Sequence, residues 1–282
     1  STMASGNVGQ YVGTSDIVMI PSIVDVAGLN AISKTIFRNA VLAAAGMVDL
    51  KDRLPQEEED GKPLVAATMF GVTTPCVEHA KECLENHGFE VMVFHATGTG
   101  GKTMEAMARS GYFKGILDLT TTEWCVQVIG GVLAVGGKRK EAASLCGIPQ
   151  VVSVGAMDMV NFGPPDTVPE KFKGRKFYQH NPTVTLMRTT LEENIEIAQR
   201  LARKLNLASG KTVLMLPLKG VSAIDVEGQP FYGPEEDAAL FRTLKENVNR
   251  SVVEIEEYDM AINDPKFAEA AAKRLIRLME NN

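Results

Sequence analysis

Residues 90–103 read EVMVFHATGTGGKT, and they are the clearest indication of the fold class. The apolar run over 90–95 predicts a buried strand, and the glycines and threonines after it predict a turn that opens a helix. Five further apolar runs show the same order of strand, turn and helical period; they are residues 64–69, 116–120, 150–154, 212–216 and 252–258. Strands alternating with helices are typical of βαβ units. We therefore predict an α/β fold: a Rossmann-like, doubly wound, mainly parallel sheet with helices on both faces.

The helices expected between these strands follow from their periodicity and from end signals. Gly88 and Gly111 sit where helices end, and Asp264-Pro265 is typical of a helix start. The predicted helices are 75–86, 102–110, 122–133, 138–146, 190–207, 235–248 and 265–280. In the last apolar run, valine and isoleucine alternate with glutamate, which predicts an edge strand with one face in water.

The first part of the chain is organised differently. Residues 1–48 are predicted to form an N-terminal arm with a long helix over 29–48, followed by an exposed polar linker at 49–61. The main Rossmann-like domain then spans 62–282. Within it, residues 156–183 are rich in Gly and Pro, and a loop of that length in a compact domain is typical of a lid or binding loop.

Composition excludes several classes of protein. The 282 residues include 29 Lys and Arg against 35 Asp and Glu, which gives a net charge of −6. This balance argues against broad nucleic-acid binding and against an anionic membrane surface as partner, because both need a basic face. No apolar run approaches the ~20 residues of a membrane span, and the first residues lack the pattern of a signal peptide. The four cysteines form no CxxC pair, which favours buried, reduced thiols in a cytoplasmic protein.

The glycine-rich turn is the strongest candidate binding element. Glycines let the backbone approach a ligand, and free amides at a helix start attract an anion such as phosphate. Neither standard phosphate-loop pattern fits, because Ala96 replaces the first glycine of one and Thr103 the third glycine of the other. The alternative is a tight turn that only packs helix on strand. The predicted ligand-binding residues of this element are Gly98, Thr99, Gly100, Gly101, Lys102 and Thr103.

Other strand ends add polar groups at the same predicted edge, since ligands of open α/β sheets bind beyond the carboxyl ends of the strands. Hydroxyls, a carboxylate and an amide for ribose, phosphate or metal come from Thr120, Thr121, Thr122, Glu123, Ser153 and Asn161. The alternative for the threonines and Glu123 is helix capping. The catalytic candidates are His180 and Asp158 as acid or base and Arg188 as an anion clamp. Asp158 is also a candidate metal ligand.

Long motifs resemble one known family. They are residues 11–30, 69–77, 94–105, 117–123, 148–169, 180–190 and 216–225. The chain resembles an uncharacterised bacterial, fungal and plant family that includes a tomato mosaic virus resistance protein, the Tm-one-like ATP-binding family. Its full unit has two Rossmann-like halves, so the resemblance implies an isolated carboxy-terminal half whose amino-terminal half is missing. It also implies ATP or a similar phosphate ligand and a homodimer or other homo-oligomer. Mg²⁺ is expected from the residues themselves, because carboxylates near the strand ends can hold one such ion beside a phosphate.

Three functions remain open at this point. The first is binding of a nucleotide (ATP-like) or phosphometabolite by the α/β domain. The second is an enzyme acting on a small phosphorylated or carboxylated metabolite through His180, Asp158 and Arg188. The third is a protein-binding scaffold, as the resemblance to the plant protein implies, with an apolar patch on the arm helix around Ile32 and Ile36. No reaction follows from the sequence.

Overall fold

The computed structural model describes residues 1–51, 53, 61–132 and 141–280. The chain divides into two compact units, residues 1–61 and 62–282. Most of the predicted linker at 49–61, and residues 138–140 of the predicted helix at 138–146, lie outside the described residues.

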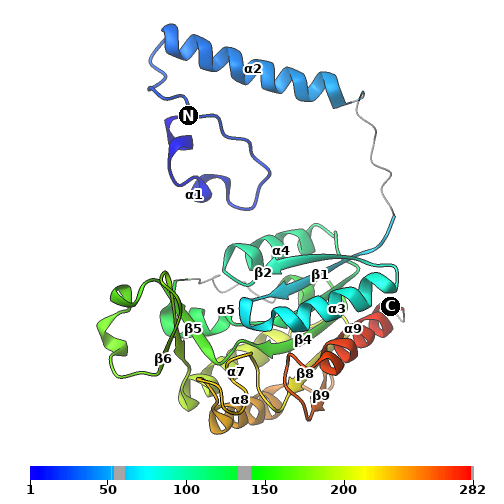
Figure 1. Cartoon of the computed structure of the whole chain (residues 1–282). Helices are drawn as coiled ribbons and strands as arrows, with labels where there is room; N and C mark the ends of the chain where they lie inside the picture. The colour runs from blue at the N-terminus through cyan, green and yellow to red at the C-terminus, as the bar shows by residue number, and fades with distance from the viewer. Residues whose placement is uncertain (52, 54–60, 133–140, 281–282) are drawn as a thin grey trace. The chain divides into compact units, whose positions relative to one another are not determined.

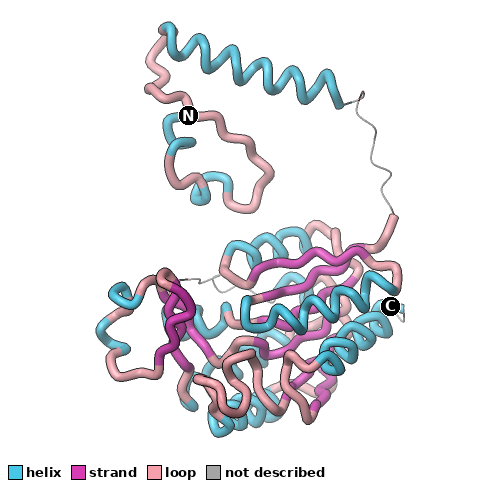
Figure 2. The backbone as a smooth tube through the Cα atoms, in the orientation of Figure 1, coloured by secondary structure: helices cyan, strands magenta, loops and turns pink. Residues whose placement is uncertain are grey.

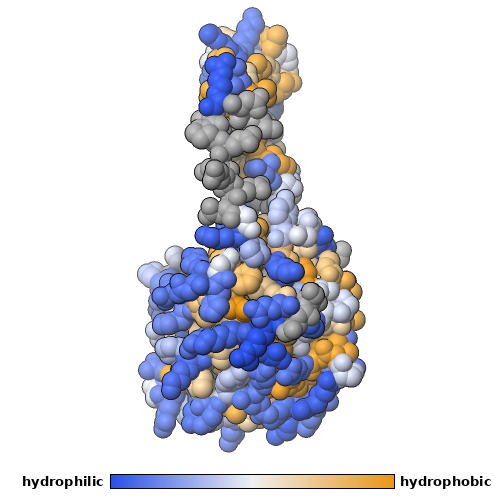
Figure 3. Space-filling model, turned by 90° about the vertical axis from the view of Figure 1, so that its right-hand side faces the viewer, coloured by the Kyte–Doolittle hydropathy of each residue, from blue (hydrophilic) through white to orange (hydrophobic). Residues whose placement is uncertain are grey.

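The first unit contains a 3-10 turn at Thr2–Ser5, a short α1 at Gly9–Val12 and the long α2 at Ala31–Lys51 (Figure 1). Asn30 caps α2, because its Oδ1 accepts from the backbone N–H of Ser33 at 2.9 Å. Within this unit, α2 leaves several large apolar side chains in water, and hydrophobic atoms are visible on its surface in Figure 3. The exposed apolar residues of α2 are Ile32, Val41, Leu42, Met47, Val48 and Leu50.

The second unit is built on a six-stranded sheet in the order β2-β1-β3-β4-β8-β9, and every neighbouring pair is parallel (Figure 2). This confirms the predicted fold class and all six predicted strands. The last strand lies at the edge and is only partly buried, as its alternating pattern predicted. The strands are β1 Leu64–Met69, β2 Glu90–His95, β3 Gly115–Thr120, β4 Gln150–Gly155, β8 Thr212–Pro217 and β9 Val253–Tyr258.

Helices cover both faces of this sheet, which is why its central strands read as continuous apolar runs. Val65 and Ala67 of β1 pack toward α3 and α9, whereas Ala66 between them packs toward α4 and α6. The helices are α3 Thr74–Asn86, α4 Thr99–Arg109, α5 Glu123–Cys125, α6 Glu141–Leu145, α7 Leu191–Leu205, α8 Pro234–Asn247 and α9 Pro265–Glu280. The helix predicted at 122–133 is present over residues 123–130, as α5 continued by a π-helical segment at Val126–Gly130.

The strand order places a crevice beside β1. From β1 the chain moves outward to β2 and then crosses to β3 on the other side of β1. The connections after β1 and β3 therefore leave the sheet in opposite directions, and this switch point at the carboxyl edge is where open α/β sheets bind ligands.

The prediction of one long loop over residues 156–183 is wrong. The region forms a second sheet of three antiparallel strands in the order β5-β7-β6, with bounds Met159–Phe162, Phe177–Asn181 and Val184–Arg188. A tight turn joins β6 to β7, and the Asn181 Oδ1 accepts from the Thr183 N–H at 2.9 Å. Most of the Gly and Pro residues lie in the connection between β5 and β6. Their abundance made the whole region resemble a loop, so the short strands on either side were not predicted.

Two further expectations concern the environment of the protein. Among the described residues, none of the helices combines the length and apolar character that crossing a bilayer requires. The expectation of four buried thiols is wrong in part, because Cys146 is exposed and Cys83 is half-buried.

Candidate functional site

A pocket of about 370 Å³ lies at the carboxyl ends of β1 and β2, next to the switch point. The small sheet β5-β7-β6 forms its opposite wall. Residues after β1 contribute Phe70, Gly71 and Val72, residues at the end of β2 contribute His95 and Thr97, and the small sheet contributes Asn161, His180 and Leu186, among others. The structure thus brings two of the predicted residues, His180 and Asn161, into one pocket.

Asn161 is the most informative side chain of this pocket. It is 1% exposed, and within the described part of the chain neither its Oδ1 nor its Nδ2 has a hydrogen-bond partner. Its backbone is fixed, because Asn161 pairs with Leu186 in the sheet and its carbonyl accepts from the N–H of Val132 at 3.0 Å. A buried amide without partners costs free energy, and a bound molecule with a matching donor and acceptor would recover it.

Two imidazoles and a hydroxyl line the rest of the polar wall. His95 ends β2, and its ring packs edge-to-face on Phe70 with centroids 5.5 Å apart. His180 lies on the exposed strand β6, on the same side of the small sheet as Asn161. Thr97 follows His95. Imidazoles and hydroxyls both donate and accept hydrogen bonds, so this wall suits an oxygen-rich ligand.

The predicted glycine loop has a different neighbour. The N–H of Gly98 donates to the Oε1 of Glu123 at 2.9 Å, and this carboxylate is 1% exposed. A Cβ added at Gly101 would lie 2.5 Å from either carboxylate oxygen of Glu123. The start of α4 therefore faces a carboxylate supplied by the exit of β3, which accepts from the Gly98 amide as a bound anion would. A phosphate at this amide would have to displace Glu123. Lys102 is exposed, and the Thr103 hydroxyl donates to the Thr99 carbonyl at 3.0 Å.

Replacing Gly100 by alanine tests how tightly this loop is packed. A Cβ at Gly100 would overlap the backbone carbonyl of His95, so we expect a loss of about 1–3 kcal/mol in the free energy of unfolding. Urea denaturation of both variants measures it, with Gly71→Ala as the matched control, because a Cβ at Gly71 meets nothing within 4 Å. Equal stability of the two variants would contradict the packing.

The predicted hydroxyls after β3 and β4 serve the interior. Thr121 donates to the Ser153 carbonyl and Ser153 donates to the Met215 carbonyl, both at 2.8 Å. Thr120 and Thr73 share a 2.8 Å hydrogen bond. The Thr122 hydroxyl donates to the Met159 carbonyl at 3.3 Å. These hydroxyls form hydrogen bonds between the ends of neighbouring strands. Their role in ligand binding stays a prediction.

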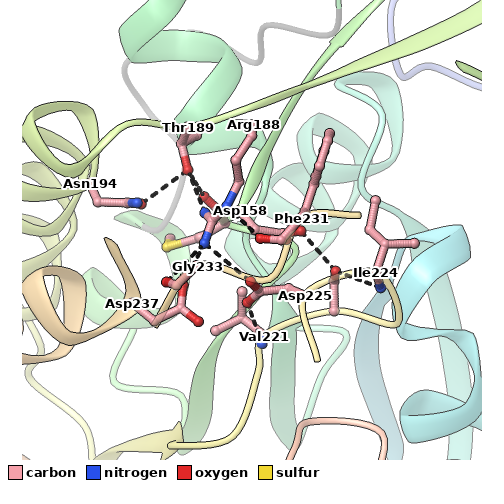
Figure 4. A network of polar contacts seen from close by, with 12 residues as sticks. Asp158, Arg188, Thr189, Asn194, Val221, Ile224, Asp225, Phe231, Gly233 and Asp237 are labelled. Carbon is pink, nitrogen blue, oxygen red and sulfur yellow. Dashed lines mark hydrogen bonds and ion pairs between the residues drawn. The ribbon is translucent and has the colours of Figure 1, made fainter. Parts of the chain in front are cut away.

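Arg188, the last residue of β7, and Asp158, just before β5, belong to a buried polar network (Figure 4). The Nη2 of Arg188 donates to Asp237 at 2.9 Å and to Asp225 at 3.1 Å. Its Nε donates to the Phe231 carbonyl at 2.8 Å and its Nη1 to the Thr189 hydroxyl at 3.0 Å. Since every nitrogen of this guanidinium has an internal acceptor, Arg188 holds the 218–233 connection and α8 to the small sheet.

The network contains more carboxyl groups than cations. Burial raises the pKa of Asp158 to about 7 and that of Asp225 to about 10, and the positive charge of Arg188 only partly opposes this. Burial also raises the pKa of Asp237. These shifts favour the protonated form of Asp225 at neutral pH and make the protonation of Asp158 sensitive to pH in the neutral range. The Oδ2 of Asp158 accepts from the Ser222 hydroxyl at 2.8 Å, and its Oδ1 has no partner among the described residues.

Sequence reasoning missed Asp237. It stands in the first turn of α8, where an acidic residue is ordinarily explained by the helix dipole. In the part of the chain that the structure describes, no three His, Cys, Asp or Glu side chains are grouped as metal ligands. The metal role of Asp158 stays a prediction.

The fold and the site define a Rossmann-like α/β protein with a largely apolar pocket, lined by a few polar side chains, at the carboxyl edge of its parallel sheet. The chain belongs to the uncharacterised protein family UPF0261: residues 1–53 match its N-terminal domain and residues 62–279 its C-terminal domain. The expected absence of the amino-terminal half is therefore wrong, and so is the expectation of an isolated carboxy-terminal half.

Relatives in bacteria and plants support this membership. A UPF0261 protein of Clostridium tetani is 60% identical over 280 residues, which are 99% of this chain and 69% of the relative. A UPF0261 protein of Rhizobium meliloti is 52% identical, over 96% of this chain and 67% of the relative. The ToMV resistance protein Tm-1(GCR237) of Solanum lycopersicum is 48% identical over 99% of this chain, which corresponds to 37% of the tomato protein.

Proposed function

We propose that residues 62–282 bind a small phosphorylated metabolite of the nucleotide class in the pocket at the carboxyl ends of β1 and β2. One observation carries this proposal: the buried amide of Asn161 lines the pocket, and neither of its polar atoms has a partner among the described residues. An amide side chain offers one donor and one acceptor side by side, which matches the edge of a nucleobase.

The remaining walls fit the other parts of such a ligand. Phe70 and Leu186 supply apolar surface, and His95, Thr97 and His180 supply hydrogen-bonding groups for phosphate or ribose oxygens. The pocket volume of about 370 Å³ is at the lower end for small-molecule sites. Mg²⁺ would then be a partner of the phosphate groups, as it commonly is in nucleotide sites, since it binds through few protein carboxylates.

Titration calorimetry of the intact chain with ATP, AMP and ribose 5-phosphate, each with and without Mg²⁺, tests the proposal. We expect Asn161→Ala to weaken binding at least about tenfold, because one or two buried hydrogen bonds to the ligand are lost. The same change is expected to leave the free energy of unfolding within about 1 kcal/mol of the wild type, since no internal hydrogen bond is removed.

Ser110→Ala is the matched control, because its exposed hydroxyl donates to the Ala106 carbonyl at 3.2 Å, at the opposite end of α4 from the glycine loop. Unchanged affinity of Asn161→Ala, together with unchanged affinity of His180→Ala, would remove this pocket from the proposal. Binding that depends on Lys102 and Gly101 instead would move the phosphate site to the start of α4.

A protein-binding role is a second candidate, and the exposed apolar side chains of α2 favour it. Val41, Met47 and Val48 are 66%, 61% and 75% exposed within their unit. Large exposed apolar patches mark interaction sites in soluble proteins. An enzymatic role has weaker support, because its three predicted catalytic residues do not lie in one site. His180 lines the pocket, whereas Asp158 and Arg188 form hydrogen bonds within the buried network.

A further inference from the structure

The small sheet carries a second concave surface, on the face opposite Asn161. This groove has a volume of about 420 Å³ and lies between the sheet and the connection from β5 to β6. Its apolar walls are Pro165, Val168, Pro169 and the ring of Phe177, and Gln179 and Thr185 contribute polar groups. Phe177 and Gln179 alternate along β6 with Tyr178 and His180, so the groove and the pocket lie on opposite faces of one strand.

The strand beside this groove has an open edge. Within the described residues, β6 pairs with β7 and with no other strand. Four of its five residues are exposed, and the fifth, Tyr178, is half-buried. An edge strand presents a row of backbone N–H and C=O groups on its outer side, and such a row is a template for one more strand.

The groove also contains a buried hydroxyl without a partner. Thr185 lies on the central strand β7, opposite Gln179, and is 4% exposed. Its Oγ1 has no hydrogen-bond partner among the described residues. A polar group in this position is satisfied when a side chain or backbone group from outside enters the groove.

The segment that leads into β6 carries an excess of positive charge, with Lys171, Lys173, Arg175 and Lys176 against Asp166 and Glu170. Lys176 directly precedes β6, and Lys171 lies over the ring of Phe172, 4.6 Å from its centroid. Neither lysine has a carboxylate partner in the described ranges, and Lys173 pairs with the exposed Glu170 at 2.9 Å. These lysines attract an acidic partner, and they repel the same edge of a second copy of this chain.

From these four observations we propose that β6 binds an acidic, extended segment of a partner protein, which adds to the small sheet as a fourth strand. The backbone of the segment pairs with the outer edge of β6. Its alternate side chains enter the groove against Phe177 and Pro169, where one polar group reaches the Thr185 hydroxyl. Its carboxylates lie near Lys171 and Lys176.

Fluorescence anisotropy with labelled eight-residue peptides tests the proposal on the intact chain. The probes alternate Val, Ile, Leu or Phe with Glu, and two matched sets replace Glu by Lys or carry N-methyl groups on alternate backbone amides. We expect the acidic peptides to bind and both matched sets to bind at least about tenfold more weakly, because they lose the charge attraction or the strand pairing. Hydrogen exchange is expected to slow at residues 177–181 when an acidic peptide is bound.

Variants of the chain locate the site. We expect the double substitution Lys171→Glu and Lys176→Glu to weaken binding about tenfold, and Thr185→Val, which keeps the shape, to weaken it about twofold to tenfold. The control is the double substitution Lys114→Glu and Lys266→Glu, which makes the same change in net charge elsewhere on the surface. It is expected to change affinity less than twofold.

Three outcomes would overturn the proposal. The first is no binding by any acidic peptide at 1 mM, and the second is equal binding of the N-methylated set. The third is a dimer, seen by sedimentation velocity, that the Lys171/Lys176 variant alters and the acidic peptides do not displace. That result would assign the edge of β6 to a second copy of the chain.

Discussion

Replacing Arg188 by methionine is expected to lower the free energy of unfolding by about 3–5 kcal/mol, the usual loss when one partner of a buried ion pair is removed. Its guanidinium is the cation that contacts both Asp225 and Asp237, and its side chain is 5% exposed. Methionine has a similar length and no charge, so packing is largely kept while Asp237, and Asp158 where it is ionised, lose their counter-charge.

The loss also has an expected pH dependence. Protonated carboxyl groups need no counter-charge, so the destabilisation caused by Arg188→Met is expected to shrink as the pH falls from 8 to 5. Urea denaturation at several pH values measures both effects. Arg200→Met is the matched control, because Arg200 pairs with Glu196 on the surface of α7 and such pairs contribute about 0.5 kcal/mol or less. A loss below about 1 kcal/mol for Arg188→Met would show that the network does not hold its three segments together.

Replacing Asp158 by asparagine is expected to stabilise the protein above pH 7. Burial raises the pKa of Asp158 to about 7, so the folded state binds its proton more tightly than the unfolded state. The contribution of this group to stability is fully present below about pH 4, the unfolded pKa, and is lost as the pH rises through about 7. Asparagine stays neutral at high pH and can still accept the hydrogen bond from Ser222. The free energy of unfolding is therefore expected to rise by up to about 4 kcal/mol, the equivalent of roughly three pKa units.

The measurement is the free energy of unfolding of wild type and Asp158→Asn at intervals from pH 4 to pH 9. The wild type is expected to lose stability between pH 4 and 7, and the variant to lose less over the same range. Burial raises the pKa of Asp225 to about 10 in both proteins. The free energy of unfolding of both is therefore expected to keep falling as the pH rises toward 10. Asp166→Asn is the control, because Asp166 is exposed on the connection after β5. Equal slopes for wild type and Asp158→Asn would contradict the raised pKa.

Much of the parallel sheet was predictable because its signal is local. Six apolar runs of about six residues, each followed by a turn and a helical period, gave the six strands within one residue at most ends. The small sheet was missed because β5 has four residues and is buried on both faces, so it shows no alternation. The Gly- and Pro-rich connection after it then made residues 156–183 look like one loop.

The candidate site was predictable only in part. His180 and Asn161 were selected as polar residues near a strand exit, and both line the pocket. Glu123 was selected for the same reason, yet its carboxylate satisfies the amide of Gly98. Polarity and position along the chain do not distinguish a pocket residue such as Asn161 from an internally bonded one such as Glu123. The difference lies in whether another part of the folded chain supplies a hydrogen-bond partner for the side chain.

The class of fold, the six parallel strands and the carboxyl edge as the expected place for a site follow from the order of residues, because burial on both faces of a strand is recorded in consecutive residues. How the polar groups are used depends on contacts that form in the folded chain. The tertiary structure brings Arg188 from β7, Asp225 from a connection and Asp237 from α8 within hydrogen-bonding distance, and it leaves the amide of Asn161 without a partner in the described residues. Hydrogen bonds and charges act over a few ångströms in space, and residues this far apart in the chain leave no periodic pattern that records their contact.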